Sequence, residues 1–421
     1  MFHVYIDYFF ICHMEFAIKF LSLVGIVAQK FYGSFRTTIL LFLLIMFFTV
    51  STYAQKAKGN AMHWKIAARL PALNAQPKSL GFAGPVAGVH ENVLVIAGGA
   101  NFPDAMPWSG GKKKYYDDVY VYLKNKKSIT LYKKIFKLPS SIAYSANCST
   151  SQGIIYAGGE NENGISNKVF LLQWDAVNET IVTKSLPDLP VAVTNAAAGF
   201  HNDIVYIAGG ETVSAAVDQF YCLDMNNMAA GWKPLPAIPK PVSHAVLITQ
   251  SNADHASIYL TGGRKKNTSG ISDLYSSFFK FDILKNQWEE KAYLPYALSA
   301  GTGIAAGSNN ILIFGGDKGE TFHKTEKFIV AINSEKDGTE KAELIQQKNT
   351  LQSSHPGFSK EILMYNSELN EWAAAGCIPF DSPVTTTAVK WGDKVIIPSG
   401  EIRAGVRTPQ ILSAKLDPKG K

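Results

Sequence analysis

A short cluster of acidic and basic residues near the C-terminal end carries the strongest chemical signal in the sequence. Residues 399–408 contain glycine and place Glu401, Arg403 and Arg407 close together, directly after an apolar run. An ionised carboxylate can take a proton from a substrate, and a guanidinium can pair with a substrate carboxylate through two hydrogen bonds. The cluster therefore predicts acid–base chemistry on an anionic substrate, with a surface ion pair on a turn as the alternative.

Polar residues also follow five other apolar runs, each of which ends in a glycine pair. The residues after these pairs include Asn101, Glu160, Glu211, Arg264 and Asp317. Carboxylates accept hydrogen bonds from hydroxyl groups and arginine binds anions, so such a set suits a polyhydroxylated small molecule. We predict a substrate-binding role for Asn101, Glu160, Glu211, Arg264 and Arg403. Ordinary turn residues are the alternative for each of them.

The glycine pairs mark a repeat that occurs six times. A β-branched apolar run ends in Gly-Gly, or in Ser-Gly in the last unit, and the second glycine is residue 99, 159, 210, 263, 316 and 400. A period of about 50 residues is typical of kelch repeats, which form the blades of β-propellers. Aromatic-rich runs, and in several units a tryptophan before a turn with proline, follow in the same order. The pattern predicts an all-β, six-bladed kelch-type β-propeller.

The two ends of the repeat region complement each other. The sixth unit ends at 410–416 without a tryptophan-containing run, and the missing element stands at 63–71. We therefore predict that the N-terminal strand closes the last blade, which leaves no free sheet edge. Residues 56–421 would then form one propeller domain.

The interval between the fifth and sixth glycine pairs is longer than the others. Its excess lies near 328–360, and residues 335–347 are rich in Lys, Glu and Gln. A loop of this length in a compact repeat protein usually has a function. We interpret it as a lid or rim segment on one face of the propeller.

The first 55 residues differ from the rest. Lys30 and Arg36 precede an apolar run at 39–50, and Ala54 follows it. This is the pattern of a secretory signal peptide, and the run is shorter than the roughly 20 apolar residues of a membrane span. We predict export and cleavage after Ala54. Residues 1–34 have apolar patches of their own and are interpreted as an upstream extension before the true start; the alternative is a second hydrophobic segment that anchors the protein.

Other classes of function find little support in the sequence. The net charge of +7 is spread along the chain, and the basic run at 112–114 is short, so we expect no nucleic-acid partner. Cys148, Cys222 and Cys377 are far apart and without CxxC spacing, and the nine His residues are scattered. Neither a disulfide framework nor a metal site is predicted.

Residues 400–408 resemble the Gly-Glu-x-x-x-Gly-x-Arg-Thr motif of the bacterial N-acetylneuraminate epimerases, which are periplasmic kelch-propeller mutarotases of sialic acid. The first unit, at 81–84, 97–103, 106–113 and 116–118, is similar to a circularly permuted branch of that family. The resemblance implies that Glu401 is the proton acceptor and that Arg407 binds or polarises the substrate. Arg403 stands in the variable part of the motif.

The resemblance also implies an isomerase that interconverts the α and β anomers of N-acetylneuraminate by opening and closing the sugar ring. Only proton transfers are required, so no cofactor is expected. The expected location is the periplasm, with no stable membrane association after cleavage of the signal peptide. The expected ligand is a small sugar acid, and the oligomeric state stays open.

A protein of this fold has three alternative functions. The first is a periplasmic carbohydrate- or protein-binding propeller without catalysis. A sialidase would need Asp-box turns (Ser-x-Asp-x-Gly-x-Thr-Trp), an arginine triad and a nucleophilic tyrosine, and the sequence has no Asp box. A copper radical oxidase would need a Tyr–Cys crosslink beside two His ligands, which nothing in the sequence suggests.

Overall fold

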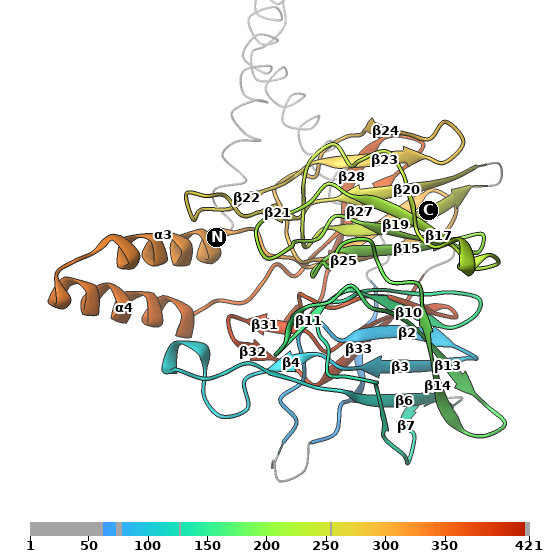
Figure 1. Cartoon of the computed structure of the whole chain (residues 1–421), viewed down its shortest axis with the longest axis horizontal. Coiled ribbons are helices and arrows are strands. Elements are labelled where there is room, and N and C mark those ends of the chain that lie inside the picture. The colour runs from blue at the N-terminus through green and yellow to red at the C-terminus, as the bar shows by residue number, and fades with distance from the viewer. Residues whose placement is uncertain (1–61, 73–77, 126–127, 253–254, 417–421) are drawn as a thin grey trace, which may run out of the picture. The chain divides into compact units, whose positions relative to one another are not determined.

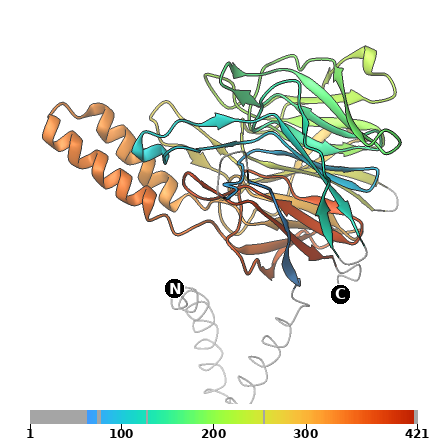
Figure 2. The same cartoon turned by 90° about the horizontal axis from the view of Figure 1, so that it is seen from below.

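The computed structural model describes residues 62–72, 78–125, 128–252 and 255–416, and the predicted signal peptide lies outside them. Six antiparallel sheets surround a central axis, with the innermost strands of neighbouring blades side by side (Figure 1, Figure 2). The predicted six-bladed β-propeller is confirmed. Each apolar run before a glycine pair forms the second strand of a blade, where it is buried between two neighbouring sheets.

The strands of each blade follow one another from the axis outward. Blade 1 contains β2 (Val86–His90), β3 (Val93–Ala97), β6 (Asp118–Lys124) and β7 (Ile129–Leu131), with β8 (Phe136–Lys137) also paired to β6. Blade 2 contains β9 (Ala146–Ser149), β10 (Ile154–Ala157), β13 (Val169–Asp175) and β14 (Thr180–Leu186). Blade 3 contains β15 (Ala197–His201), β16 (Ile204–Ala208), β17 (Phe220–Asp224) and β18 (Lys233–Pro234).

The other three blades repeat this order. Blade 4 contains β19 (Val246–Asn252), β20 (His255–Thr261), β23 (Phe278–Asp282) and β24 (Gln287–Glu290). Blade 5 contains β25 (Thr302–Ala306), β26 (Asn310–Phe314), β27 (Glu361–Asn366) and β28 (Glu371–Cys377). Blade 6 contains β29 (Val389–Trp391), β30 (Lys394–Pro398), β33 (Gln410–Lys415) and β1 (Trp64–Arg69).

Short hairpins and helices extend from these blades. The hairpins pair β4 (Ala100–Asn101) with β5 (Lys114–Tyr115), β11 (Glu160–Asn161) with β12 (Gly164–Ile165), β21 (Arg264–Lys265) with β22 (Asp273–Leu274), and β31 (Glu401–Arg403) with β32 (Val406–Arg407). The helices are the α-helices α3 (Glu320–Ser334) and α4 (Gly338–Ser353) and the 3-10 helices η1 (Pro107–Ser109) and η2 (Met228–Ala230).

The N-terminal strand closes the propeller as predicted. Strand β1 pairs with β33, so that Trp64 lies opposite Ala414 and Arg69 opposite Gln410. Trp64 packs edge-on against Phe314 of blade 5, with ring centroids 5.6 Å apart. The first segment of the propeller thereby completes its last blade, and β33 is paired on both sides, with β1 and with β30.

Six residues form a closed circle of backbone hydrogen bonds around the axis. They precede the innermost strands and are Gly84, Tyr144, Asn195, His244, Ala300 and Thr385. The amide of each donates to the carbonyl of the one before it, and the amide of Gly84 donates to Thr385 at 2.7 Å, which closes the circle. All six have φ between 50° and 61°. The circle fixes the spacing of the blades at the axis.

The glycine pairs allow neighbouring blades to approach each other. The amide of Gly159 donates to the carbonyl of Val193 in the next blade at 2.8 Å. A Cβ atom on Gly158 would lie 2.3 Å from the same carbonyl, which no side chain tolerates. The 209–210 pair makes the same contacts with Val242. The repeated glycines are therefore a requirement of the contact between blades.

The long fifth interval is helical, which corrects the expectation of a loop. Helices α3 and α4 form a hairpin that projects from the propeller (Figure 2). The side chain of Asp337 caps α4 by accepting from the amides of Thr339 and Glu340. The Lys, Glu and Gln that indicated an exposed loop are also good helix formers, and this explains the difference. Among the residues that the structure describes, no helix is long and apolar enough to cross a membrane.

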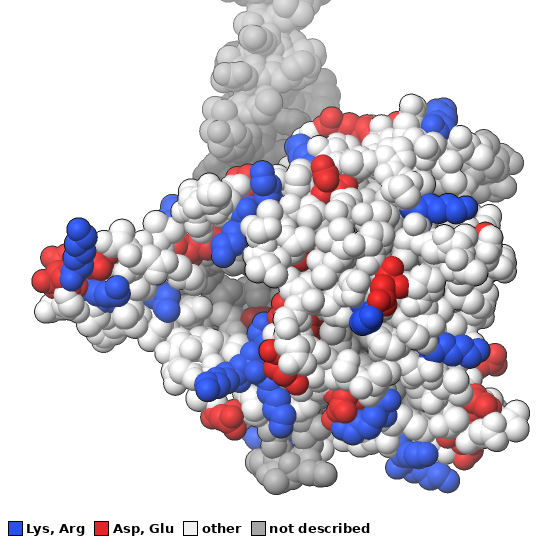
Figure 3. All heavy atoms as spheres, in the orientation of Figure 1, with Lys and Arg blue, Asp and Glu red and all other residues white. Residues whose placement is uncertain are grey.

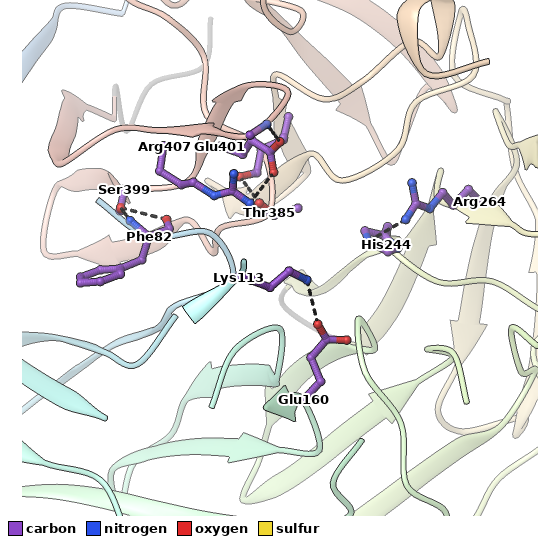
Figure 4. A network of polar contacts seen from close by, with 11 residues as sticks. Phe82, Lys113, Glu160, His244, Arg264, Thr385, Ser399, Glu401 and Arg407 are labelled. Carbon is purple, nitrogen blue, oxygen red and sulfur yellow. Dashed lines mark hydrogen bonds and ion pairs between the residues drawn. The ribbon is translucent and has the colours of Figure 1, made fainter. Parts of the chain in front are cut away.

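Ser399 joins the last blade to the first one, at the position that a glycine occupies in the other units. Its fully buried Oγ accepts a hydrogen bond from the amide of Phe82 at 2.8 Å (Figure 4). The hydroxyl donates to one of two carbonyls, that of Thr408 at 2.7 Å or that of Phe82 at 3.0 Å. These contacts satisfy buried backbone groups at the seam.

Replacing Ser399 with Ala should lower the free energy of unfolding by about 1–3 kcal/mol, because the buried amide of Phe82 loses its partner. Chemical denaturation measures this difference. Ser399→Gly is the matched control: it also lacks the hydroxyl, but it relieves the positive φ of 56° and should lose less stability. If Ser399→Ala is as stable as the unmodified protein, the hydroxyl does not hold the seam.

Candidate functional site

A cavity of about 430 Å³ lies against the central circle, a size typical of small-molecule sites. The space-filling view shows this side of the molecule hollowed beside the α3–α4 hairpin (Figure 3). Every blade and the hairpin contribute to its wall, including Phe102, Lys113, Glu160, Glu211, Arg264, Asp317, Phe322, His355, Glu401 and Arg407.

The architecture brings one residue of every blade to the axis, namely the residue after the second glycine. In each blade it forms a β-bridge with the residue directly before a member of the central circle. Glu401 pairs in this way with Val384, and Arg264 pairs with Ser243. In chain order the six residues are Ala100, Glu160, Glu211, Arg264, Asp317 and Glu401. Five of them are charged and line the cavity. Four residues predicted from sequence (Glu160, Glu211, Arg264 and Glu401) therefore lie together around one space.

Glu401 and Arg407 face each other across the β31–β32 hairpin, where they form a register pair (Figure 4). The Oε2 atom of Glu401 lies 3.3 Å from Nη2 of Arg407, and its Oε1 accepts from the amide of Gly405 at 2.9 Å. The guanidinium also stacks on Phe102, 4.7 Å from the ring centroid. Arg407 and the amide of Gly405 thus hold the carboxyl group of Glu401 at the cavity wall.

The guanidinium of Arg407 has unused hydrogen-bond donors. Its side chain is only 3% exposed, and neither Nε nor Nη1 has a partner among the described residues. Leaving buried donors unsatisfied is costly, more so when they are charged. Because Arg407 lines the cavity, an anionic ligand there would supply the missing acceptors.

A second ion pair joins Lys113 to Glu160, with 3.0 Å between Nζ and Oε1 (Figure 4). The hydroxyl of Tyr115 donates to the same oxygen at 2.8 Å. Burial, together with this hydrogen bond, raises the pKa of Tyr115 to about 12. Tyr115 therefore remains a hydrogen-bond donor to Glu160 at neutral pH.

A chain of four side chains crosses the opposite wall. Arg264 donates from Nη2 to Nε2 of His244 at 3.3 Å, so the imidazole proton sits on Nδ1, 3.0 Å from the hydroxyl of Ser243. That hydroxyl donates to Glu211 at 3.3 Å. Burial, with Arg264 and Lys113 nearby, holds the pKa of His244 well below its usual value. His244 is therefore a neutral link between a cation and an anion.

Asp317 and His355 complete the wall beside the hairpin. Oδ1 of Asp317 accepts from the amide of Gly319 at 2.8 Å, and burial raises the pKa of this carboxyl. Nδ1 of His355 accepts from the amide of Gly357 at 3.0 Å, which fixes the proton of the neutral ring on Nε2. Burial lowers the pKa of His355, although Asp317 and Glu401 act in the opposite sense. His355 is therefore within electrostatic range of both Asp317 and Glu401.

The helical hairpin is attached to the propeller on both sides of the cavity. On α3, the buried carboxylate of Glu326 accepts from the hydroxyl of Ser272 at 2.6 Å and from its amide at 2.9 Å. Phe322 of the same helix covers the guanidinium of Arg264 at 4.6 Å. On α4, Asn349 donates to the carbonyl of Trp108 at 3.2 Å. The hairpin therefore forms part of the wall between blades 4 and 1.

Two residues predicted to bind substrate do not line the cavity. Asn101 is buried, where it donates to the carbonyl of Gly81 and accepts from Tyr116. It follows Ala100, which occupies the axial position, and side chains alternate along a strand. Arg403 is half-exposed and lies 3.5 Å from Asp381, because the β31–β32 pairing shifts register between 401 and 403. In this structure neither side chain lies in the cavity wall: Asn101 binds the backbone of Gly81, and Arg403 lies beside Asp381.

The sequence prediction missed Lys113, His244 and His355. An alignment of the repeats could have indicated His244, because an apolar residue and a small residue precede five of the six members of the central circle, as in 142–144 and 242–244. Lys113 and His355 reach the cavity from a hairpin and from the end of α4, and no local pattern signals that approach. Among the described residues, no cluster of His, Cys, Asp and Glu suits a metal ion.

The sequence was compared with protein-family models and with curated proteins. The family model for N-acetylneuraminate epimerase matches residues 48–181 and 186–421. Proteins named N-acetylneuraminate epimerase are similar to this chain. The one from Haemophilus influenzae (strain 86-028NP) is 26% identical over 56% of this chain and 61% of its own length. That from Brucella melitensis biotype 1 is 26% identical over 58% and 62%, and that from Salmonella typhimurium 25% over 58% and 61%. The match thus spans about three fifths of these relatives.

The neutral state of His244 predicts how stability depends on pH. Below its ordinary pKa of 6.5, the unfolded chain binds a proton at this residue and the folded protein does not. The free energy of unfolding should therefore fall as the pH falls from 7 to 5. His244→Asn should flatten this dependence by up to about 1.4 kcal/mol per pH unit.

Denaturation series at several pH values test this expectation. His90, whose pKa burial also lowers, is only half-buried, so His90→Asn should flatten the dependence less. An unchanged slope in His244→Asn would contradict the assignment of a neutral His244.

Proposed function

Because this chain belongs to the N-acetylneuraminate epimerase family, we propose that it is a mutarotase that interconverts the α and β anomers of N-acetylneuraminate. The family model matches most of the chain, and proteins of that name are among its relatives. The cavity adds independent support, since its size, charges and hydrogen-bonding groups suit a small sugar acid.

The observation that carries the proposal is the buried guanidinium of Arg407. Its Nε and Nη1 have no partner among the described residues, and both belong to a group that binds carboxylates in bidentate fashion. In N-acetylneuraminate the carboxylate is attached to the anomeric carbon. A carboxylate on Arg407 therefore brings the anomeric hydroxyl near Glu401, which lies 3.3 Å from the same guanidinium.

Glu401 is the proton acceptor in this reaction. It takes the proton of the anomeric hydroxyl while the bond from the anomeric carbon to the ring oxygen breaks, and the sugar opens to its keto form. Rotation and closure on the other face of the carbonyl give the other anomer. General acid–base catalysis of this kind contributes on the order of 10²–10⁴-fold, enough for a reaction that also proceeds unaided.

The other charged residues of the cavity wall orient the sugar. Glu160 and Glu211 offer carboxylate oxygens to hydroxyl groups, and Lys113 and Arg264 offer charged donors. These residues are proposed to fix the ring and its substituents, so that the anomeric centre meets Glu401 in one orientation. The protein is further proposed to act in the periplasm, on the evidence of the basic and apolar N-terminal pattern.

Glu401→Gln should abolish the acceleration of anomer exchange, because the amide cannot accept the proton. A sialidase releases α-N-acetylneuraminate from a sialoside, and proton NMR follows its decay to the β form with and without the protein. Glu371→Gln, an exposed position on β28 outside the cavity, is the matched control and should keep full activity. No acceleration by the unmodified protein would reject the mutarotase and leave a propeller that binds without catalysis.

Arg407→Lys should weaken binding of N-acetylneuraminate by about tenfold or more, since lysine keeps the charge but loses the planar pair of donors. Isothermal titration calorimetry gives the dissociation constant. Lys137, which pairs with Asp117 and Asp118, does not line the cavity, so Lys137→Ala serves as the control. Unchanged affinity in Arg407→Lys would mean that another cation binds the carboxylate.

A further inference from the structure

Ring opening also requires a group that gives a proton to the ring oxygen. We infer that Asp317 is this proton donor, a role that rests on the proposed function. Asp317 occupies the axial position of blade 5, next to the blade that carries Glu401, and both side chains line the same cavity. The two carboxyl groups thus approach a bound sugar from adjacent blades.

Hydrogen bonding separates Asp317 from the other carboxylates of the cavity. Each of the other three contacts a donor side chain. Glu160 contacts Lys113, Glu211 contacts Ser243, and Glu401 contacts Arg407. Asp317 has only the amide of Gly319, which binds Oδ1, and no described side chain donates to it. Donors favour the ionised form of a carboxyl group. Asp317 therefore has the fewest hydrogen-bond donors of the four among the described residues.

The other titratable groups of the wall are less suited to give a proton. Both ring nitrogens of His244 are engaged, by Arg264 and by Ser243. Nδ1 of His355 accepts from the amide of Gly357, so a second proton would break that hydrogen bond. Lys113 is committed to the ion pair with Glu160. A neutral imidazole and a paired ammonium are weak acids compared with a protonated carboxyl.

The surroundings of Asp317 determine when it is protonated. Burial raises the pKa of Asp317, and the amide of Gly319 together with His355, Arg264 and His323 opposes this change. A sugar acid in the cavity adds a negative charge and displaces water, both of which favour the protonated carboxyl. Binding should therefore be accompanied by uptake of a proton.

The proton balance of the reaction closes with these two residues. Glu401 takes the proton of the anomeric hydroxyl, whose oxygen becomes the carbonyl oxygen. The electron pair of the broken bond moves to the ring oxygen, which takes the proton of Asp317. On closure, the hydroxyl formed from the ring oxygen attacks the carbonyl and returns its proton to Asp317, while Glu401 gives its proton to the carbonyl oxygen.

Asp317→Asn tests this role, because the amide oxygen can still accept from Gly319 but the side chain has no acidic proton. In the NMR assay the variant should be about 10²–10⁴-fold slower at pH 7, with little change in affinity. The rate of the unmodified protein should fall as the pH rises through the pKa of Asp317 in the complex, and this fall should be absent in the variant. Calorimetry in buffers of different ionisation enthalpy should detect proton uptake on binding in the unmodified protein only.

Asp282→Asn is the matched control, since Asp282 accepts backbone hydrogen bonds in a turn of blade 4 outside the cavity. It should behave as the unmodified protein. The inference is overturned, while the proposed function stands, if Asp317→Asn keeps the full rate. The same holds if its rate still falls as the pH rises, or if it still takes up a proton on binding. If the unmodified protein does not accelerate anomer exchange at all, the proposed function fails and the role of Asp317 fails with it.

Discussion

The closed circle of backbone hydrogen bonds at the axis is the constraint on which the rest of this structure depends. Each of its six amides has one acceptor, on the neighbouring blade, so the circle closes only when all six blades are present. Five of the six residues are not glycine, although all have positive φ. Such conformations cost on the order of 1 kcal/mol each, and packing between the blades offsets that cost. The strain is thus concentrated where the cavity begins.

The circle also determines which residues can do chemistry. Its neighbours form β-bridges with the residues that follow the glycine pairs, and this places one side chain per blade at the cavity. Each of these residues exchanges two backbone hydrogen bonds with the residue directly before the circle, so the side chains need little reorganisation to meet a ligand. Two buried donors of Arg407 have no partner among the described residues, and a rigid frame prevents an acceptor from moving to satisfy them. Preorganisation of this kind lowers the cost of binding.

The sequence predicted the repeat and the closure because both are properties of periodic residues. The glycine pairs mark the contacts between blades, and Trp64 marks the strand that the last unit lacks. The positions of Asn101 and Arg403 could not be predicted at this level, because alternation along two-residue strands and a register shift decide which way each side chain points. His355 reaches the cavity only through the helical hairpin, whose polar composition suits a loop as well as a helix.

The attachment of the hairpin favours a rim over a lid. Moving α3 away from the propeller would leave the buried carboxylate of Glu326 without the amide and hydroxyl of Ser272. Hydrogen bonds to a charged group contribute about 1.5–3 kcal/mol each, so this motion would cost several kcal/mol. The same motion would uncover Arg264 by removing Phe322 from its guanidinium, and it would release His355 from the neighbourhood of Asp317 and Glu401. The hairpin is therefore best understood as a fixed wall that sets the polarity of one half of the cavity, while the blades set the other.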